Sequence, residues 1–170
     1  MEMKIGLEIE RKYIIKMPNS MVLAAQPDYT ESKITQIYIK GEPGETRRVR
    51  RRIFSDKTEY YETTKRPVSS IASDEREREI GREEYERLSA EILEGSSPVE
   101  KIRHTFTYLG QTFEIDVYPQ WHSTAIMETE LHTPDTVVEM PEFLHIIREV
   151  TGIKAYSNAS MSREFPPEDK

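Results

Sequence analysis

Like-charged residues at alternating positions are the feature that most constrains the fold of this chain. Side chains two residues apart on a β-strand share a face, and several predicted strands place two like charges on one face. The pairs are Glu8/Glu10, Arg48/Arg50, Glu77/Glu79, Lys101/Arg103, Glu114/Asp116 and Glu128/Glu130, and a further strand contributes Lys65. Like charges on one strand repel each other mildly, so a face that only meets water gains nothing from them. The sorting of charge by strand therefore favours an enclosed, charged interior.

The opposite faces of these strands are apolar. Phe113, Ile115 and Val117 alternate with acidic residues, and Met127 and Leu131 do so on the next strand. One face of an antiparallel sheet commonly meets water, and any single charged pair fits that alternative. Eight strands closed into a barrel instead remove exposed edges and leave an interior that holds a small ligand. We therefore expect the charged faces inside a barrel and the apolar faces packed outside it.

The periodicity and the turn residues predict an α+β fold, mainly antiparallel β, in which a closed eight-stranded barrel is flanked by helices. The predicted strands cover residues 7–16, 34–40, 46–54, 59–65, 75–80, 99–109, 112–118 and 125–132. Gly110-Gln111 is the expected turn between the sixth and seventh strands. Helices are expected over residues 82–94, from Pro141 to Gly152 and over residues 157–161, followed by a frayed tail over 165–170.

The bulk composition bounds the class of protein. The 170 residues fit one domain over residues 1–170 and include no cysteine, which excludes disulfide scaffolds and thiolate metal sites. No apolar run reaches the roughly 18–20 residues of a membrane span, so we expect a cytoplasmic protein without a membrane partner. The net charge of −7 argues against a nucleic-acid partner. The 24 lysines and arginines still suffice for a basic pocket, and a homodimer stays open.

The expected interior combines several cations with several carboxylates, and this chemistry limits the ligand. Arg and Lys side chains grip phosphate oxygens, while clustered carboxylates bind Mg²⁺ or Mn²⁺. A neutral sugar or an apolar ligand would not offset the cost of burying so many charges. The pattern therefore predicts a small polyanion that binds together with a divalent metal. The four histidines show no metal-ligand spacing, and Trp121 is expected to serve in packing.

A run of short motifs follows the predicted strands. Glu8-Ile9-Glu10-Arg11-Lys12 reads E-x-E-x-K near the N-terminus. Further elements follow in order: Gln36-Ile37-Tyr38, Arg48-Val49-Arg50, Lys65, Glu77 with Glu79, Lys101-Ile102-Arg103, Glu114-Ile115-Asp116, Glu128-Thr129-Glu130, and Lys154 with Tyr156-Ser157-Asn158. Together they resemble the CYTH superfamily, also called triphosphate tunnel metalloenzymes, over about residues 5–160. One departure is Arg66-Pro67, which follows Lys65 where many relatives have a glycine.

The resemblance implies an eight-stranded tunnel, dependence on Mg²⁺ or Mn²⁺, and hydrolysis of a phosphoanhydride bond in a triphosphate. The expected metal ligands are Glu8, Glu10, Asp116, Glu128 and Glu130, with supporting roles for Glu77, Glu79 and Glu114. The expected substrate-binding residues are Lys12, Arg48, Arg50, Lys65, Lys101, Arg103 and Lys154. The candidate catalytic residues are Lys12, Tyr38 and Asp116.

Inorganic tripolyphosphate is the expected substrate, because Gln36-Ile37-Tyr38-Ile39 resembles the small bacterial triphosphatases more than the cyclases. Three alternatives stay open: a thiamine triphosphatase, a class IV-type adenylate cyclase that converts ATP to cyclic AMP, and a non-catalytic module that binds polyphosphate or nucleotide. A cyclase needs a nucleoside pocket, which no part of the sequence clearly supplies. A binding module would be favoured if the metal ligands were missing, and they are present.

Overall fold

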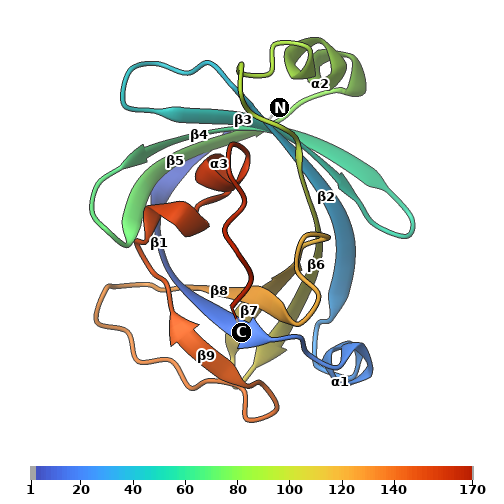
Figure 1. Cartoon of the computed structure of the whole chain (residues 1–170), viewed down its shortest axis with the longest axis vertical. Helices are drawn as coiled ribbons and strands as arrows, with labels where there is room; N and C mark the ends of the chain where they lie inside the picture. Colours follow the sequence, from blue (N-terminus) through green and yellow to red (C-terminus); the bar gives the residue numbers. More distant parts are fainter. Residues whose placement is uncertain (1–2, 170) are drawn as a thin grey trace.

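Eight antiparallel strands close into a barrel in a computed structural model that describes residues 3–169. Around the barrel the order is β5-β4-β3-β2-β6-β7-β8-β1, and β1 pairs with β5 to close it (Figure 1). The strands are β1 (Met3–Lys16), β2 (Thr30–Ile39), β3 (Thr46–Ile53), β4 (Thr58–Pro67), β5 (Ala72–Glu79), β6 (Val99–Tyr108), β7 (Gln111–Val117) and β8 (Thr124–Glu130). The predicted closed eight-stranded barrel is therefore confirmed.

The long first strand forms the seam of the barrel. Its first half pairs with β5, from Met3 to Ile9, and its second half pairs with β8, from Glu10 to Lys16. Because β1 leaves β5 halfway, one edge of its second half is open. A ninth strand, β9 (Ile146–Glu149), pairs with this edge.

The apolar core lies outside the barrel, between its wall and the segments that cover it. Phe113, Ile115 and Met127 pack against the chain between β8 and β9. On another side α2 (Arg82–Ser89) covers β2 and β3, and its Tyr85 and Leu88 are buried there. Apolar side chains on the outside of the wall leave the inside to the charged faces of the strands.

The predicted helix from Pro141 to Gly152 is wrong. The chain runs irregularly from Pro141 to β9, which adds to the open edge of β1. Its apolar residues do not share a helical face, because Ile146 packs with the outer core of β7 and β8 whereas Ile147 packs with a different cluster. Neighbours that point to opposite sides have the period of a strand. The free strand edge therefore outweighed the helical spacing.

The other helical predictions differ in their limits. The helix expected over residues 82–94 ends at Ser89, because the next apolar residues join β2: Ile92 forms a β-bridge with Ile39. The sequence did not predict α1 (Ser20–Ala24), which Asn19 caps and which is too short for a periodic signal. No helix among residues 3–169 is both long enough and apolar enough to span a membrane.

The C-terminal part of the chain covers one end of the barrel. We call η1 (Lys154–Tyr156) and α3 (Asn158–Met161) the C-terminal cap; both lie across the barrel opening in Figure 1. The expected frayed tail is instead fixed over residues 165–169, and Lys170 lies outside the described residues. Trp121 Nε1 donates to the carbonyl of Pro166 at 3.0 Å, and Arg148 pairs with Asp169 at 2.8 Å. Trp121 thus packs in the core, as predicted.

Two loops meet at the rim of this end. Gly152 has a φ of +73°, and a Cβ added there would lie 2.9 Å from the backbone oxygen of Ser70. Gly110 has a similar φ of +77°, but no atom lies within 4 Å of its added Cβ. Gly110 belongs to the β6–β7 turn, which is Leu109-Gly110 and lies one residue before the predicted one.

We expect Gly152→Ala to reduce the free energy of unfolding by about 1–3 kcal/mol more than Gly110→Ala does. Both substitutions carry the penalty of a positive φ, but only the first forces a side chain against backbone. Urea unfolding of the two variants measures the difference. Equal losses would show that the two loops do not need this close approach.

Candidate functional site

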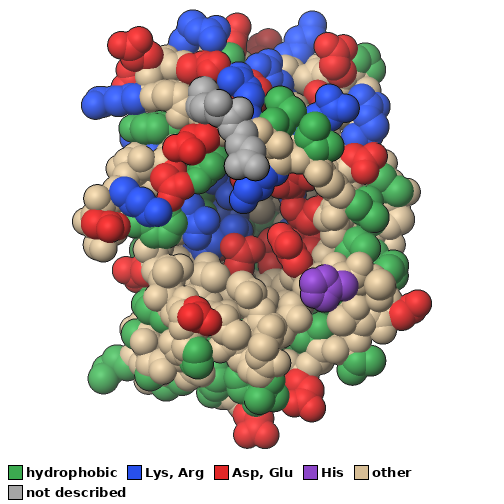
Figure 2. Space-filling model, turned by 180° about the vertical axis from the view of Figure 1, so that it is seen from behind, with side chains coloured by type: hydrophobic (Ala, Val, Ile, Leu, Met, Phe, Trp, Pro, Cys, Tyr) green, Lys and Arg blue, Asp and Glu red, His purple; other side chains and the backbone are tan. Residues whose placement is uncertain are grey.

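A charged cavity of about 600 Å³ occupies the inside of the barrel. Figure 2, which views the molecule from behind Figure 1, shows Lys, Arg, Asp and Glu side chains gathered in a hollow. Most predicted site residues line the cavity: Glu8, Glu10, Lys12, Tyr38, Arg48, Arg50, Lys65, Glu77, Lys101, Arg103, Glu114, Glu128, Glu130 and Lys154. Asp116 and Glu79 do not line it. The alternating charged faces of the strands therefore do converge on one enclosed space.

Three arginines of β3 form a row along one side of the cavity. We call Arg48, Arg50 and Arg52 the arginine row. Among residues 3–169, no carboxylate lies within 4.0 Å of any of the three guanidinium groups. Buried Nε atoms of Arg48 and Arg50 have no hydrogen-bond partner. The row therefore presents positive charge that the described part of the protein does not neutralise.

The pKa of Arg50 reports this excess of positive charge. Burial, together with the nearby Arg48 and Arg103, lowers it to about 9. Among the described residues, the side chain of Arg50 makes one hydrogen bond, and its acceptor is neutral: Nη2 donates to Gln36 Oε1 at 2.8 Å. A bound anion would remove both the repulsion between the guanidinium groups and the unfilled hydrogen-bonding capacity.

Four other cations of the cavity, Lys12, Lys65, Lys101 and Arg103, are paired with carboxylates. Lys12 Nζ lies 3.3 Å from Glu128, and Lys65 Nζ lies 2.9 Å from Glu8. Arg103 donates to Asp116 through Nε and Nη2 and to Glu114 through Nη1. These groups still face the cavity, but their charge is partly compensated. The arginine row is thus the side of the cavity best suited to bind an anion.

Several carboxylates lie close together on another part of the cavity wall, which β7, β8 and β1 form. We call Glu10, Glu114, Glu128 and Glu130 the acidic wall. The strand register places Glu10 directly opposite Glu130 and Glu114 directly opposite Glu128. Like charges at directly opposite positions destabilise a sheet. Within residues 3–169 the side chains of Glu10 and Glu130 also take part in no hydrogen bond or ion pair.

Burial and then crowding raise the pKa values of the unpaired carboxyl groups. Burial, and then the charge of Glu128, raises the pKa of Glu10 to about 8. Burial and neighbouring carboxylates, with Glu8 first among them, also raise the pKa of Glu130. Oxygen donors of this kind are the ligands that Mg²⁺ and Mn²⁺ prefer. The acidic wall therefore has the chemistry of a divalent-metal site.

The oxygen donors of the acidic wall suit such a metal, but they do not form a complete coordination sphere. Among the described residues, no three acidic or histidine side chains lie close enough together to hold a metal as they stand. Lys12 and Lys65 instead occupy part of the space by pairing with Glu128 and Glu8. Glu10 and Glu130 provide the carboxylates that no cation of the described chain neutralises.

Asp116 lies behind the cavity surface and, unlike the other predicted metal ligands, does not line the cavity. Its side chain is 1% exposed, and both of its oxygens accept hydrogen bonds from Arg103. One of these oxygens also lies 2.8 Å from Lys101 Nζ. Burial alone would raise the pKa of Asp116, but Arg103 and Lys101 hold it well below its ordinary value. This geometry makes Asp116 an anchor for two cavity cations.

The pKa values of two cavity lysines, Lys101 and Lys12, shift in opposite directions. Burial lowers the pKa of Lys101 to about 7, against the opposing effect of Asp116. Burial acts in the same direction on Lys12, but Glu128 and Glu10 outweigh it and raise the pKa of Lys12 above its ordinary value. Lys12 therefore stays an ammonium group, which favours a phosphate-binding role over that of a base.

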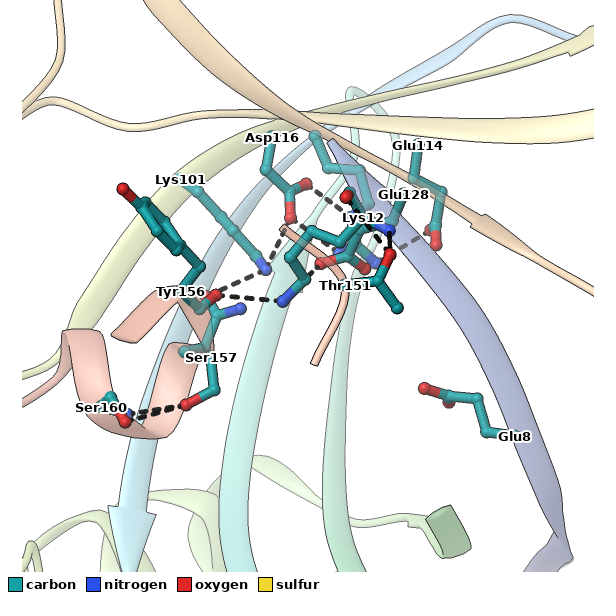
Figure 3. A network of polar contacts seen from close by, with 12 residues as sticks. Glu8, Lys12, Lys101, Glu114, Asp116, Glu128, Thr151, Tyr156, Ser157 and Ser160 are labelled. Atoms are coloured by element: carbon teal, nitrogen blue, oxygen red, sulfur yellow. Dashed lines mark hydrogen bonds and ion pairs between the residues drawn. The ribbon is translucent and has the colours of Figure 1, made fainter. Parts of the chain in front are cut away.

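The C-terminal cap supplies acceptors to both lysines. The carbonyl of Tyr156 accepts a hydrogen bond from Lys12 Nζ at 3.0 Å, and Asn158 Oδ1 lies 3.3 Å from Lys101 Nζ. Figure 3 shows Lys12 and Lys101 of the strands pointing toward Tyr156 of the cap, while Glu8 stands apart from them. Tyr118 also donates to Asn158 at 3.1 Å. The motif around Tyr156 and Asn158 therefore positions side chains at the covered end of the cavity.

Sequence reasoning missed two charged residues among those that line the cavity. Glu75 lines the cavity beside Lys65, at 3.3 Å, and burial and its hydrogen bond with Glu8 raise its pKa to about 7. Arg52 completes the arginine row. Both follow the same alternation as residues that were predicted. Glu79, which was predicted, is exposed at the end of β5 and does not line the cavity.

Comparison with known proteins agrees with this geometry. The family model described as CYTH domain matches residues 6–164. An inorganic triphosphatase of Acetivibrio thermocellus is 30% identical over 158 residues, which cover 92% of this chain and 94% of that protein. The crystal structure of an inorganic triphosphatase has a TM-score of 0.59 and 26% identity, over 94% of this chain and 97% of that one.

A further solved structure supports the fold. A protein of Pyrococcus horikoshii has a TM-score of 0.55 at 21% identity, over 75% of this chain and 80% of that chain. The family match spans nearly all of the described residues and confirms the resemblance inferred from the motifs. The chain therefore belongs to the CYTH domain family.

Proposed function

We propose that this protein is a divalent-metal-dependent triphosphatase that hydrolyses a phosphoanhydride bond of inorganic tripolyphosphate. The observation that carries the proposal is the charge left uncompensated in one cavity, where Arg48 and Arg50 of the arginine row and Glu10 and Glu130 of the acidic wall lack counter-ions among the described residues. A metal–polyphosphate complex supplies both. The relatives that are inorganic triphosphatases support this choice of substrate.

The phosphates would bind to the basic side chains of the cavity. Guanidinium forks of Arg48 and Arg50 suit bidentate contacts with phosphate oxygens. The other substrate ligands in this proposal are Lys12, Lys65, Lys101, Arg103 and Lys154, all of which line the cavity. Fixed cations in a partly enclosed site stabilise the charge that develops during phosphoryl transfer.

The metal would bind to the acidic wall together with Glu8. Glu8, Glu10, Glu128 and Glu130 would provide the ligands, with Glu114 and Glu77 beside them. A bound Mg²⁺ or Mn²⁺ supplies a Lewis acid for phosphate oxygens and lowers the pKa of coordinated water. Asp116 serves in this proposal to hold Arg103 and Lys101 in place.

The remaining roles fall to Lys12, Lys101 and Tyr38, which line the cavity. Lys12 stays protonated and offsets negative charge on the phosphate that leaves. Lys101, with its pKa near 7, can hold or release a proton at neutral pH. Tyr38 also lines the cavity, and Gln36 Nε2 lies 3.4 Å from the Tyr38 hydroxyl. In this proposal Tyr38 orients the neighbouring groups.

Tripolyphosphate, ATP and thiamine triphosphate, each with Mg²⁺ or Mn²⁺, test the function directly. We expect phosphate release from tripolyphosphate with the highest kcat/KM of the three. Cyclic AMP formed from ATP would select a cyclase instead, and a preference for thiamine triphosphate would select that hydrolase. Inertness toward all three would contradict the proposal and leave a binding module.

Glu10→Gln should reduce metal-dependent kcat by about 10²-fold or more, because it removes a carboxylate ligand without changing the size of the side chain. Glu79→Gln is the matched control, since Glu79 is exposed and does not line the cavity. We expect less than about a twofold change for the control. Initial rates of phosphate release over a range of Mn²⁺ concentrations measure both, and equal rates for the two variants would contradict the metal assignment.

The raised pKa of Glu10 makes the stability of the metal-free protein depend on pH. This pKa is about 8 when folded and 4.5 ordinarily, so folding favours the protonated form. The contribution of protonated Glu10 to the free energy of unfolding is therefore lost as the pH rises through 8. At a pH of about 8.5 we expect Glu10→Gln to be more stable than wild type by at least about 1 kcal/mol. Near a pH of about 5 the difference should vanish. Thermal or urea unfolding with chelator measures it, and a pH-independent difference would contradict the crowding.

A further inference from the structure

The third arginine of the row has no part in the function described so far. Arg52 lies on the same face of β3 as Arg48 and Arg50 and lines the same cavity. Its Nε donates to Ser32 Oγ at 2.8 Å, and its guanidinium group lies 4.8 Å from the centroid of the Phe54 ring. One edge of the guanidinium is thus held in place, while Nη1 and Nη2 form no hydrogen bond within residues 3–169.

The charge of Arg52 is not compensated by its acidic neighbours. Glu59 pairs with Lys57 at 3.2 Å and accepts a hydrogen bond from Tyr61. Glu114 turns to Arg103, with an Nη1–Oε2 distance of 2.8 Å. Among residues 3–169, no carboxylate comes within 4.0 Å of Arg52. An anion is the partner that this side chain lacks.

Position along β3 distinguishes Arg52 from the other two arginines. Arg48 pairs across the sheet with Tyr38, which belongs to the same apolar cluster as Tyr156 of the C-terminal cap. From there β3 runs away from the cap, and Arg52 lies four residues further, about 13 Å along the strand. The row therefore extends from the covered end of the cavity toward the opposite, open end, where Figure 2 shows the charged hollow.

The spacing of the row sets how much of a linear polyphosphate it can contact. Side chains two residues apart on a strand are about 7 Å apart, and a chain of three linked phosphates is comparable in length to one such step. A triphosphate held by Arg48 and Arg50 leaves Arg52 facing the next position toward the open end. The cavity, at about 600 Å³, has room for a longer chain.

We infer that Arg52, which Ser32 holds in place, forms a further phosphate subsite that contacts linear inorganic polyphosphates of four or more phosphates and is not reached by tripolyphosphate. The inference rests on the proposed function for the position of the first three phosphates. It extends the ligand class of the cavity to longer chains, and it assigns to Arg52 the recognition of chain length.

Calorimetric titration of metal-free protein with tripolyphosphate and with tetrapolyphosphate tests this subsite, alongside kcat/KM for both with Mn²⁺. Arg52→Gln should weaken tetrapolyphosphate binding by about tenfold or more, the value of one charge-assisted contact. Tripolyphosphate binding should change by less than about threefold. Arg50→Gln should weaken both ligands, and Arg51→Gln, on the other face of β3, is the control that should change neither.

The outcomes separate this inference from the proposed function. Equal weakening of both ligands by Arg52→Gln, or no weakening of either, would overturn the subsite even if tripolyphosphate is hydrolysed. Selective weakening of tetrapolyphosphate without any phosphate release would support the subsite and overturn the triphosphatase. Arg52→Lys keeps the charge but loses the forked guanidinium. An intermediate loss of affinity for tetrapolyphosphate, with tripolyphosphate affinity unchanged, confirms that a folded protein is being compared.

Discussion

Charge that the protein does not neutralise inside a closed barrel is the constraint on which the rest of the structure depends. Burying ionised groups without partners is costly, and like charges directly opposite on neighbouring strands repel. The apolar residues therefore pack outside the wall, where α2 and the chain before β9 cover them. A ligand that is itself a complex of cation and polyanion would compensate both sides of the cavity, which explains why neither the arginine row nor the acidic wall pairs fully within the described chain.

Much of this arrangement could be predicted from residue alternation, because the face of a strand to which a side chain points depends only on parity. That rule placed Glu10, Arg50 and Lys101 in the cavity correctly. Parity does not give depth along the barrel, which depends on strand tilt and register. Glu79 has the right parity but lies beyond the cavity, while Glu75 and Arg52 share the parity of their neighbours and do line it.

Tertiary contacts account for what the sequence could not give. Asp116 was expected to face the ligand, but its carboxylate oxygens contact Lys101 and Arg103 of β6 instead. The helix predicted from Pro141 to Gly152 gave way to β9, because β1 offers an open edge only in the closed barrel. The cap reaches Lys12 through a backbone carbonyl of Tyr156, and no side-chain pattern signals such a contact. Each case depends on segments far apart in the sequence.

A crystal structure of the protein with tripolyphosphate and Mn²⁺, with the metal located by anomalous scattering, tests the central claim most directly. The charge distribution predicts phosphate density against Arg48 and Arg50 and a manganese peak between the phosphates and the carboxylates of Glu10 and Glu130. Density for both ligands on the outside of the barrel, with the cavity holding only water at saturating ligand, would contradict the account.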